Sequence, residues 1–458
     1  MKNSEFLGTA PIGKLLFKLA IPTISAQLIN MLYNIVDRIF IGHMEGVGDL
    51  ALTGVGICMP VIMIVSAFAA LISAGGAPRA SIFLGKGDKE SAERTMGNCF
   101  FLQAIVSLVI TVLVLAFHSK FLTAFGASAE TLPYAEEYLK IYAVGTIFVQ
   151  LTLGMNAYIT AQGYTAVSMT TVLIGAAANI ILDPIFIYLF DMGVSGAALA
   201  TVISQGLSCV FSVSFLFSKR SGLRLRFKNM KLDGKIIFPC IALGIAPFAM
   251  QASESVIAVC FNSSLLQYGG NIAVGAMTIL TSVMQFAMLP LQGLAQGAQP
   301  ILSYNFGAEK ADRVRHTFRL LLVSSLVYSF TLWAFIMILP EGFAGIFTTE
   351  PSLIAFTARA LRVYCGVLCI FGIQIACQMT FVALGRAGAS AIVAIVRKFV
   401  LLLPLIYLVP CIFTADKTFA VYLAEPIADV IAVTFTAVLF SFRFRAALRT
   451  IEDKKTDS

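Results

Sequence analysis

The chain has 458 residues, of which 59% are hydrophobic and only 12% are charged, whereas a soluble domain usually carries about 25% charged residues. This composition indicates an integral membrane protein and argues against a soluble enzyme or a soluble binding domain. The net charge of +8 would fit either a nucleic-acid-binding surface or the sidedness of a membrane protein, so the positions of Lys and Arg must decide.

Twelve apolar runs are long enough to cross a bilayer, which needs about 20 residues for each helix. Apolar and polar residues do not alternate with a period of two, so the runs predict helices rather than strands. The sequence therefore predicts an all-α integral membrane protein with twelve transmembrane helices. In chain order, the runs cover residues 15–42, 50–74, 94–117, 136–161, 165–190, 194–218, 236–261, 272–296, 316–339, 359–384, 387–410 and 418–441.

Lys and Arg gather on one side of the predicted membrane. With the N-terminus placed inside, the inner segments hold 24 of the 32 Lys and Arg, and the outer loops hold 2. This is the positive-inside pattern, so we expect both termini to be cytoplasmic and no nucleic acid to be bound. The inner segments of this count are 1–14, 75–94, 219–235, 297–315, 385–398 and 442–458.

An internal duplication divides the chain. One constant shift in residue number superposes Gly75 on Gly297 and Tyr142 on Tyr364, and we call this shift the repeat offset. Each half then holds six helices, and because six is even the halves are parallel repeats about an axis along the membrane normal. Two pseudo-symmetric lobes around a central cavity are typical of an alternating-access transporter. The expected parts are an N-terminal lobe (1–218), a basic cytoplasmic linker (219–235), a C-terminal lobe (236–441) and a basic cytoplasmic tail (442–458).

The first lobe carries two carboxylates inside its predicted spans. A charge at the bilayer centre costs roughly 2.5–3.5 kcal/mol, so such residues tend to be kept for a function. Asp37 ends a polar stripe on the first span, and Asn179 lies one helical turn before Asp183 on the fifth. Because a helix rises about 1.5 Å per residue, both carboxylates and Thr201 are expected at similar depth in the outer half of the lobe. Their oxygens could share a proton or coordinate a small hard cation such as Na⁺.

Each of these residues also has a purely structural interpretation. Asp183 precedes a proline and could stabilise a helix irregularity, and Asp37 could pair with the neighbouring Arg38. Asn179 could serve only as a hydrogen-bonding contact between helices, and Thr201 could serve only in packing. The sequence leaves these alternatives open.

The second lobe offers a weaker pattern. Glu254 lies within its first span, as a pore or a packing residue, and Glu425 precedes a proline and is expected to be structural. The repeat offset puts Leu405 opposite Asp183, so the ionisable pair is expected in the first lobe only. Pro22, inside the first span, removes a helix hydrogen bond and permits a bend that could link ion binding to gating, or it marks a fixed kink.

Several stretches together resemble the multidrug and toxic compound extrusion (MATE) transporters. They are AIPTISAQLINMLYNIVDRIFIGH, the loop LGKGDKESAE, NIILDPIFIY and the basic central loop. The resemblance covers nearly the whole chain and implies a V-shaped bundle of two six-helix lobes in a bacterial plasma (inner) membrane. It also implies export of bulky, often cationic drugs in exchange for protons or sodium ions.

In one bacterial branch of that family the coupling site lies in the N-lobe. Its first-helix aspartate matches Asp37, its fifth-helix asparagine and aspartate match Asn179 and Asp183, and its sixth-helix threonine matches Thr201. The resemblance thus implies a cation-coupling site at these residues, and the proline of the first helix matches Pro22.

Two further residues enter through the same resemblance, as a possible relay or substrate contact. The fourth-helix tyrosine and asparagine of that branch match Tyr138 and Asn156, although depth along the helix puts Asn156 near the inner end. Another branch uses a seventh-helix glutamate, which Glu254 misses by one residue, and a tenth-helix acid, where this chain has Gln374 and Gln378. A coupling site in the C-lobe is therefore not expected.

The competing classes are excluded to different degrees. A flippase for a lipid-linked precursor, from the same superfamily, would need cationic residues in the lumen for a pyrophosphate. An intramembrane aspartyl protease would place its aspartates in YD and GxGD contexts, which VDR and LDP do not match. A channel would not need duplicated lobes with acids in only one of them.

No GxxxxGK[ST] motif is present, so ATP is not the expected energy source. We expect a monomeric transporter, not an enzyme, with no cofactor beyond its coupling ion.

Overall fold

The computed structural model describes residues 5–44 and 46–456, and every regular element among them is a helix. The first four residues of the predicted N-terminal lobe and the last two of the predicted tail lie outside this range. The first half contains α1 (Phe6–Thr9), α2 (Ile12–Gly42), α3 (Gly48–Gly85), α4 (Lys89–Ala124), α5 (Leu132–Ala161), α6 (Thr165–Pro184), the π-helical η1 (Ile185–Leu189) and α7 (Gly193–Phe217). The second half contains, after η2 (Phe227–Asn229), α8 (Gly234–Gly307), α9 (Ala311–Ile338), α10 (Pro340–Gly345), α11 (Pro351–Tyr364), η3 (Leu368–Ile370), α12 (Phe371–Ala383), α13 (Ala387–Ile395), η4 (Val396–Leu402), α14 (Leu403–Ile412) and α15 (Lys417–Thr456).

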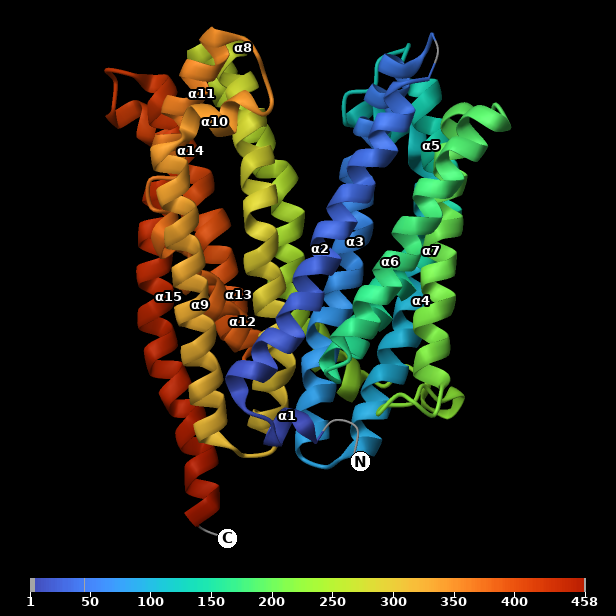
Figure 1. Cartoon of the computed structure of the whole chain (residues 1–458), viewed down its shortest axis with the longest axis vertical. Coiled ribbons are helices and arrows are strands. Elements are labelled where there is room, and N and C mark those ends of the chain that lie inside the picture. The colour runs from blue at the N-terminus through green and yellow to red at the C-terminus, as the bar shows by residue number, and fades with distance from the viewer. Residues whose placement is uncertain (1–4, 45, 457–458) are drawn as a thin grey trace.

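The number of membrane-crossing segments depends on whether α8 is counted as one helix or as two. Ten of the described helices are long and apolar enough to cross a membrane, or eleven if α11 and α12, which meet at 46°, form one span. The 74 residues of α8 are two helices that meet at Gly270, where φ is 65°. An ordinary side chain would be strained there, so glycine permits the reversal at the upper end of α8 in Figure 1. Counting α8 twice gives twelve segments in the described part of the chain.

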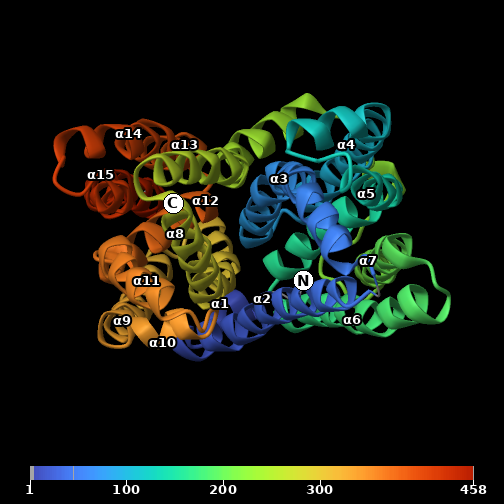
Figure 2. The same cartoon turned by 90° about the horizontal axis from the view of Figure 1, so that it is seen from above.

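The helices form two bundles that diverge like the arms of a V (Figure 1). One bundle contains α2 to α7, and the other contains α8 to α15. Both marked chain ends lie at the same end of the molecule, which we call the termini end. Seen from above, α2 and α3 are the helices of the first bundle that face α8 (Figure 2). The all-α fold expected from the apolar runs is confirmed.

The duplication is visible in the backbone. Gly163 and Gly385 both adopt positive φ, 88° and 71°, immediately before α6 and α13. They are separated by the repeat offset found in the sequence. Gly87 (φ 77°) and Glu309 (φ 56°), separated by the same offset, both precede helix starts, at α4 and α9. The two halves therefore share their helix boundaries at these turns.

The lobes touch each other through reciprocal glycine contacts near the termini end. A Cβ on Gly85 would lie 2.0 Å from the carbonyl oxygen of Tyr304, and one on Gly307 would lie 2.0 Å from that of Ile82. Each contact is the other shifted by the repeat offset, so the pseudo-twofold axis passes between the ends of α3 and α8. Glycine is required at both positions because the backbones of the two lobes meet there.

Enlarging Gly85 is expected to shift the equilibrium between the conformation with the lobes in contact and the one with the lobes apart. Gly85→Ala adds a methyl group where no space exists, and such overpacking typically costs about 1–3 kcal/mol. The cost falls only on the conformation in which the termini end is closed, so the equilibrium should shift toward separated lobes. Spin labels placed on α4 and α9 should report a longer distance by double electron–electron resonance. Gly388→Ala is the control, because a Cβ there meets nothing within 4 Å; equal distance distributions in the two variants would contradict the prediction.

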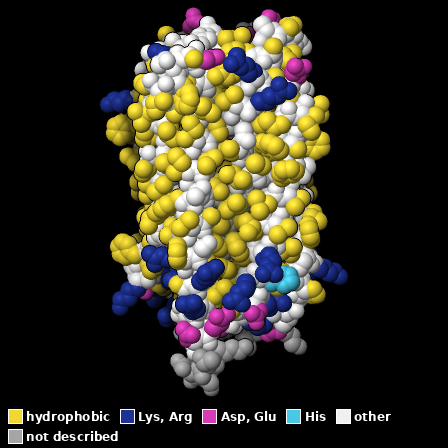
Figure 3. Space-filling view, turned by 90° about the vertical axis from the view of Figure 1, so that its left-hand side faces the viewer, with side chains coloured by type: hydrophobic (Ala, Val, Ile, Leu, Met, Phe, Trp, Pro, Cys, Tyr) yellow, Lys and Arg dark blue, Asp and Glu magenta, His cyan; other side chains and the backbone are white. Residues whose placement is uncertain are grey.

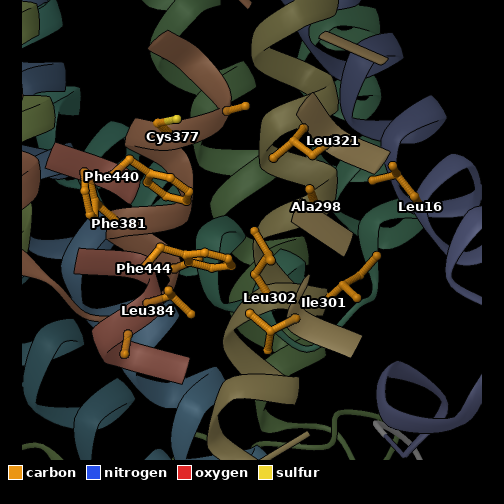
Figure 4. Close-up of a cluster of buried hydrophobic side chains, with 14 of the residues drawn as sticks. Leu16, Ala298, Ile301, Leu302, Leu321, Cys377, Phe381, Leu384, Phe440 and Phe444 are labelled. Atoms are coloured by element: carbon orange, nitrogen blue, oxygen red, sulfur yellow. The ribbon is translucent and has the colours of Figure 1, made fainter. Parts of the chain in front are cut away.

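A buried aromatic and aliphatic core fills the second lobe near the termini end (Figure 4). The rings of Phe318, Phe440 and Phe444 contact one another, with centroids of Phe440 and its two neighbours 4.4 and 4.7 Å apart and those of Phe318 and Phe444 5.0 Å apart. Leu16 of α2 belongs to the same cluster, so the first lobe also contributes to this core. Outside it, the face in Figure 3 carries a broad apolar belt bounded by charged side chains at both ends, as expected for a protein embedded in lipid.

Candidate functional site

A buried polar cluster lies between α2 and α6 in the first lobe. Asp37 comes from α2, where it is 8% exposed, and Asp183 and Asn179 come from α6, where they are 0% and 1% exposed. All three side chains are buried, so they are polar groups held inside the lobe. Site residues that were predicted from two distant spans of the sequence are thus brought together in the fold.

The hydrogen bonding of this cluster is incomplete. The Nδ2 group of Asn179 donates to Oδ1 of Asp183 at 3.1 Å. The carboxyl groups of Asp37 and Asp183 lie within hydrogen-bonding reach of each other. Each residue has one buried oxygen that finds no hydrogen-bond partner among the described residues: Oδ1 of Asp37, Oδ2 of Asp183 and Oδ1 of Asn179. Buried polar atoms are normally satisfied, so three unsatisfied acceptors in one place fit a proton or a cation.

The local helix geometry separates two interpretations of Asp183. Pro184 cannot donate to the preceding turn, and the helix continues as the π-helical η1 from Ile185. A helix irregularity therefore exists, as the structural alternative requires. The carboxyl group of Asp183, however, contacts Asn179 and Asp37. Such π segments recur at functional sites, and here the segment follows directly after the cluster.

A ring of hydroxyl and amide groups surrounds the two carboxyls. Tyr138 of α5 is buried, and its hydroxyl group lies near Thr201 on α7. Tyr33 of α2 lies near Gln205 on α7 and is close enough to both aspartates to interact with them electrostatically. Sequence reasoning missed Tyr33 and Gln205. Their spacing holds the signal: Tyr33 is one turn before Asp37, and Gln205 is one turn after Thr201.

Two predicted residues lie away from this cluster. Asn156 donates to the carbonyl oxygen of Ser168 at 3.4 Å, eleven residues or roughly 16 Å along α6 from Asn179. Pro22 lies inside α2, which remains one continuous helix, and the next residue, Thr23, donates to the carbonyl oxygen of Gly293 in the other lobe at 2.6 Å. Pro22 thus lies at the contact between the lobes, several turns before Asp37.

The second lobe contains a buried ion-pair network that the sequence analysis did not foresee. Arg397 donates from Nε to Asp429 at 2.8 Å and from Nη2 to Glu425 at 2.9 Å, and all three residues are 7% exposed. The guanidinium group also lies over the ring of Phe371, 4.8 Å from its centroid. The expectation that Glu425 is structural is consistent with this pairing.

The count of inner positive charges needs a correction here. Arg397 and Lys398 were assigned to the inner segment 385–398, but both are buried within the helical stretch formed by α13, η4 and α14. The segment 385–398 overlaps the predicted span 387–410, so the charge count assigned to water two cations that the apolar run already contained. Lys398 pairs with Glu254 of α8 at 2.9 Å, so Glu254 has a cationic partner.

The two lobes therefore differ in charge balance. In the second lobe, two cations face three carboxylates, and every one of the five is engaged in an ion pair. In the first lobe, the two carboxyls have no ion pair among the described residues. The described residues contain no group of three His, Cys, Asp or Glu side chains suited to a transition metal. The first-lobe oxygens instead suit a proton or a hard monovalent cation.

Comparison with known proteins gives consistent similarities over the whole chain. The MatE family model matches residues 22–185 and 247–408. A multidrug export protein, MepA of Staphylococcus haemolyticus (strain JCSC1435), is 26% identical over 448 residues, covering 97% of both chains. A crystal structure of MATE in the bent conformation superposes with a TM-score of 0.92 at 24% identity, covering 99% of both chains. An outward-facing conformation of a multidrug resistance MATE family transporter of the MOP superfamily has a TM-score of 0.89 at 23% identity, covering 98% of this chain and 99% of the other.

Proposed function

Because this chain belongs to the MatE family, we propose that it is a secondary active multidrug exporter, which moves lipophilic and often cationic compounds out of the cell by antiport with protons or sodium ions. The observation that carries the proposal is the Asp37–Asp183 pair, buried between α2 and α6 with three unsatisfied oxygens around it. The similarity to a multidrug export protein of Staphylococcus haemolyticus supports the same function.

Exchange follows from the electrostatics of the pair. Two buried carboxylates within hydrogen-bonding reach repel each other, and a bound proton or Na⁺ between them removes that repulsion. Asn179 orients the carboxyl group of Asp183 by donating a hydrogen bond to it. Tyr138 and Thr201 supply the polar groups on the side of the site formed by α5 and α7. When the site loses its cation, the lobe regains negative charge, which favours a cationic drug. Ion and drug then compete for one lobe, and this competition couples their transport.

The two six-helix lobes are the moving units of this proposal, 1–218 and 236–441, joined by the basic linker 219–235. We place the termini end, with the linker and the tail 442–458, in the cytoplasm of a bacterial plasma membrane, because 22 of the 32 Lys and Arg still fall in the segments predicted to be inner when the buried Arg397 and Lys398 are left out of the 24. With this placement, the contact between the lobes near the termini end closes the transporter on its cytoplasmic side. Pro22, beside the Thr23–Gly293 contact, is placed to let α2 bend as the lobes part.

The substrate class follows from the composition of the lobes. The chain has 37 Phe and 16 Met, and the flexible, polarizable side chain of Met adapts to ligands of different shape. Arg397 and Lys398 are each held by carboxylates, which weakens the alternative of a flippase that grips a pyrophosphate. We propose that a monomer acts without ATP and without a cofactor other than the coupling ion.

The energy source is tested with inside-out vesicles that accumulate a fluorescent lipophilic cation. Transport should continue without ATP as long as a proton or sodium gradient is present, and it should stop when ionophores collapse both gradients. Nigericin and monensin, added separately, indicate which ion drives it. Transport that survives both ionophores but needs ATP would refute antiport.

A second expectation concerns selectivity. Expression in a drug-sensitive bacterial host should raise tolerance to flat lipophilic cations, because the described cations of the second-lobe network are all neutralised by carboxylates. Minimal inhibitory concentrations of matched cationic and anionic dyes measure this. Equal or greater protection against the anionic dyes would count against a cation-selective exporter.

A further inference from the structure

The termini end of the second lobe carries a basic groove that the transport function does not use. It lies between α9 and α15 and has a volume of about 570 Å³. Arg315 and Arg319 line it from α9, and Arg445 and Arg449 line it from α15. Within each pair the residues are four apart, so they project from the same helix face.

Only one of these four arginines is paired with a carboxylate among the described residues. Arg315 is paired with Glu452 at 2.9 Å and with Asp312 at 3.4 Å, and the first of these pairs joins α15 to α9. Arg319, Arg445 and Arg449 form no ion pair among the described residues. All three are exposed. The groove therefore presents unneutralised guanidinium groups, which recognise phosphate with paired N–H donors.

The floor of the groove is apolar and lies at the boundary of the apolar belt. Phe318 and Leu322 of α9 and Phe444 and Leu448 of α15 line the floor, and Glu452 of α15, the ion-pair partner of Arg315, completes the lining. Figure 3 shows Lys and Arg side chains gathered directly below the apolar belt on this face. Farther along α9, toward the opposite end, Val323 and Val327 are 52% and 61% exposed, so an apolar surface continues up from the groove.

We propose that this groove binds the headgroup of an anionic phospholipid. The phosphate would lie among Arg319, Arg445 and Arg449, and an acyl chain would lie along the exposed apolar surface of α9. A free phosphate would use only the arginines and would leave the apolar floor exposed, whereas a lipid satisfies both. Basic pockets between transmembrane helices on the cytoplasmic side are suited to such headgroups.

Native mass spectrometry of the detergent-purified full chain tests the site. The wild-type protein is titrated with phosphatidylglycerol, with phosphatidylcholine and with inorganic phosphate. The altered protein carries Arg319→Gln, Arg445→Gln and Arg449→Gln. The control carries Lys219→Gln, Lys228→Gln and Lys231→Gln, which removes the same charge from exposed positions of the linker. Melting temperatures of all three proteins are measured in detergent to verify folding.

We expect the wild-type and control proteins to bind phosphatidylglycerol in preference to phosphatidylcholine and to bind inorganic phosphate weakly. Affinity for phosphatidylglycerol should fall about fivefold for each arginine removed, which is on the order of 100-fold for three. Equal binding by the groove variant and the linker variant would overturn the proposal, as would tight binding of inorganic phosphate alone. If the triple variant melts early, the single variant Arg319→Gln must still show the fivefold loss.

Discussion

Asp183→Asn is expected to insert into the membrane normally and to lose gradient-driven export, falling to the rate of cells that lack the transporter. Asn keeps the size of the side chain and can still contact Asn179, but it can neither release a proton nor offer a charged oxygen to Na⁺. Asp37→Asn should behave in the same way, because each carboxyl group lies within hydrogen-bonding reach of the other. Dye efflux from energised cells, normalised to the amount of transporter in the membrane, measures the effect.

Glu254→Gln is the matched comparison in the other lobe. It also removes one carboxylate, but Glu254 is 62% exposed at its side chain and is paired with Lys398, so it should reduce export far less. If Asp183→Asn exports at the parental rate while Glu254→Gln abolishes coupling, the coupling site lies in the second lobe. A sodium-driven transporter should show the same order of variants, with export that rises with sodium at fixed pH.

Arg397→Met is expected to produce the largest loss of stability. It leaves Glu425 and Asp429 as buried, unpaired carboxylates, and breaking a buried ion pair from one side typically costs about 3–5 kcal/mol. The purified variant should therefore melt well below the wild type in detergent, with no direct effect on the first-lobe site. Thermal unfolding followed by intrinsic fluorescence measures the difference.

The triple variant Arg397→Met, Glu425→Gln and Asp429→Asn separates lost charge pairing from lost packing. Removing all three charges removes the unpaired carboxylates, so most of the stability should return. A single variant with the wild-type melting temperature would contradict the role of the network. A triple variant no better than the single one would show that the packing of Arg397 over Phe371 matters more than its charge.

The fold could be predicted because lipid imposes simple constraints. Long apolar runs in a bilayer form helices, and the repeat offset already predicts the duplication that Gly163 and Gly385 show in the backbone. The single helical element α8 also resolves into the two predicted spans at Gly270. The reciprocal contacts of Gly85 and Gly307 could not be predicted, because which backbones meet depends on how the lobes are placed.

The candidate site was predictable where polar residues are rare. Asp37, Asn179 and Asp183 stand out against apolar neighbours, and helical spacing alone puts two of them on one face. The network around Arg397 was missed for the opposite reason. The charge count assigned Arg397 to the inner segment 385–398, although the predicted span 387–410 also contains it, and only the packing of α13–α14 against α15 shows that it is buried with acidic partners.

Ion release on drug binding tests the central claim most directly. The purified protein, in weakly buffered solution with a pH-sensitive dye or a sodium electrode, is mixed with a lipophilic cation that it exports. The Asp37–Asp183 exchange predicts release of protons or sodium ions as the drug binds, and no release from Asp183→Asn. Release that is equal in the wild type and the variant, or drug binding by the wild type with no ion released, would contradict it.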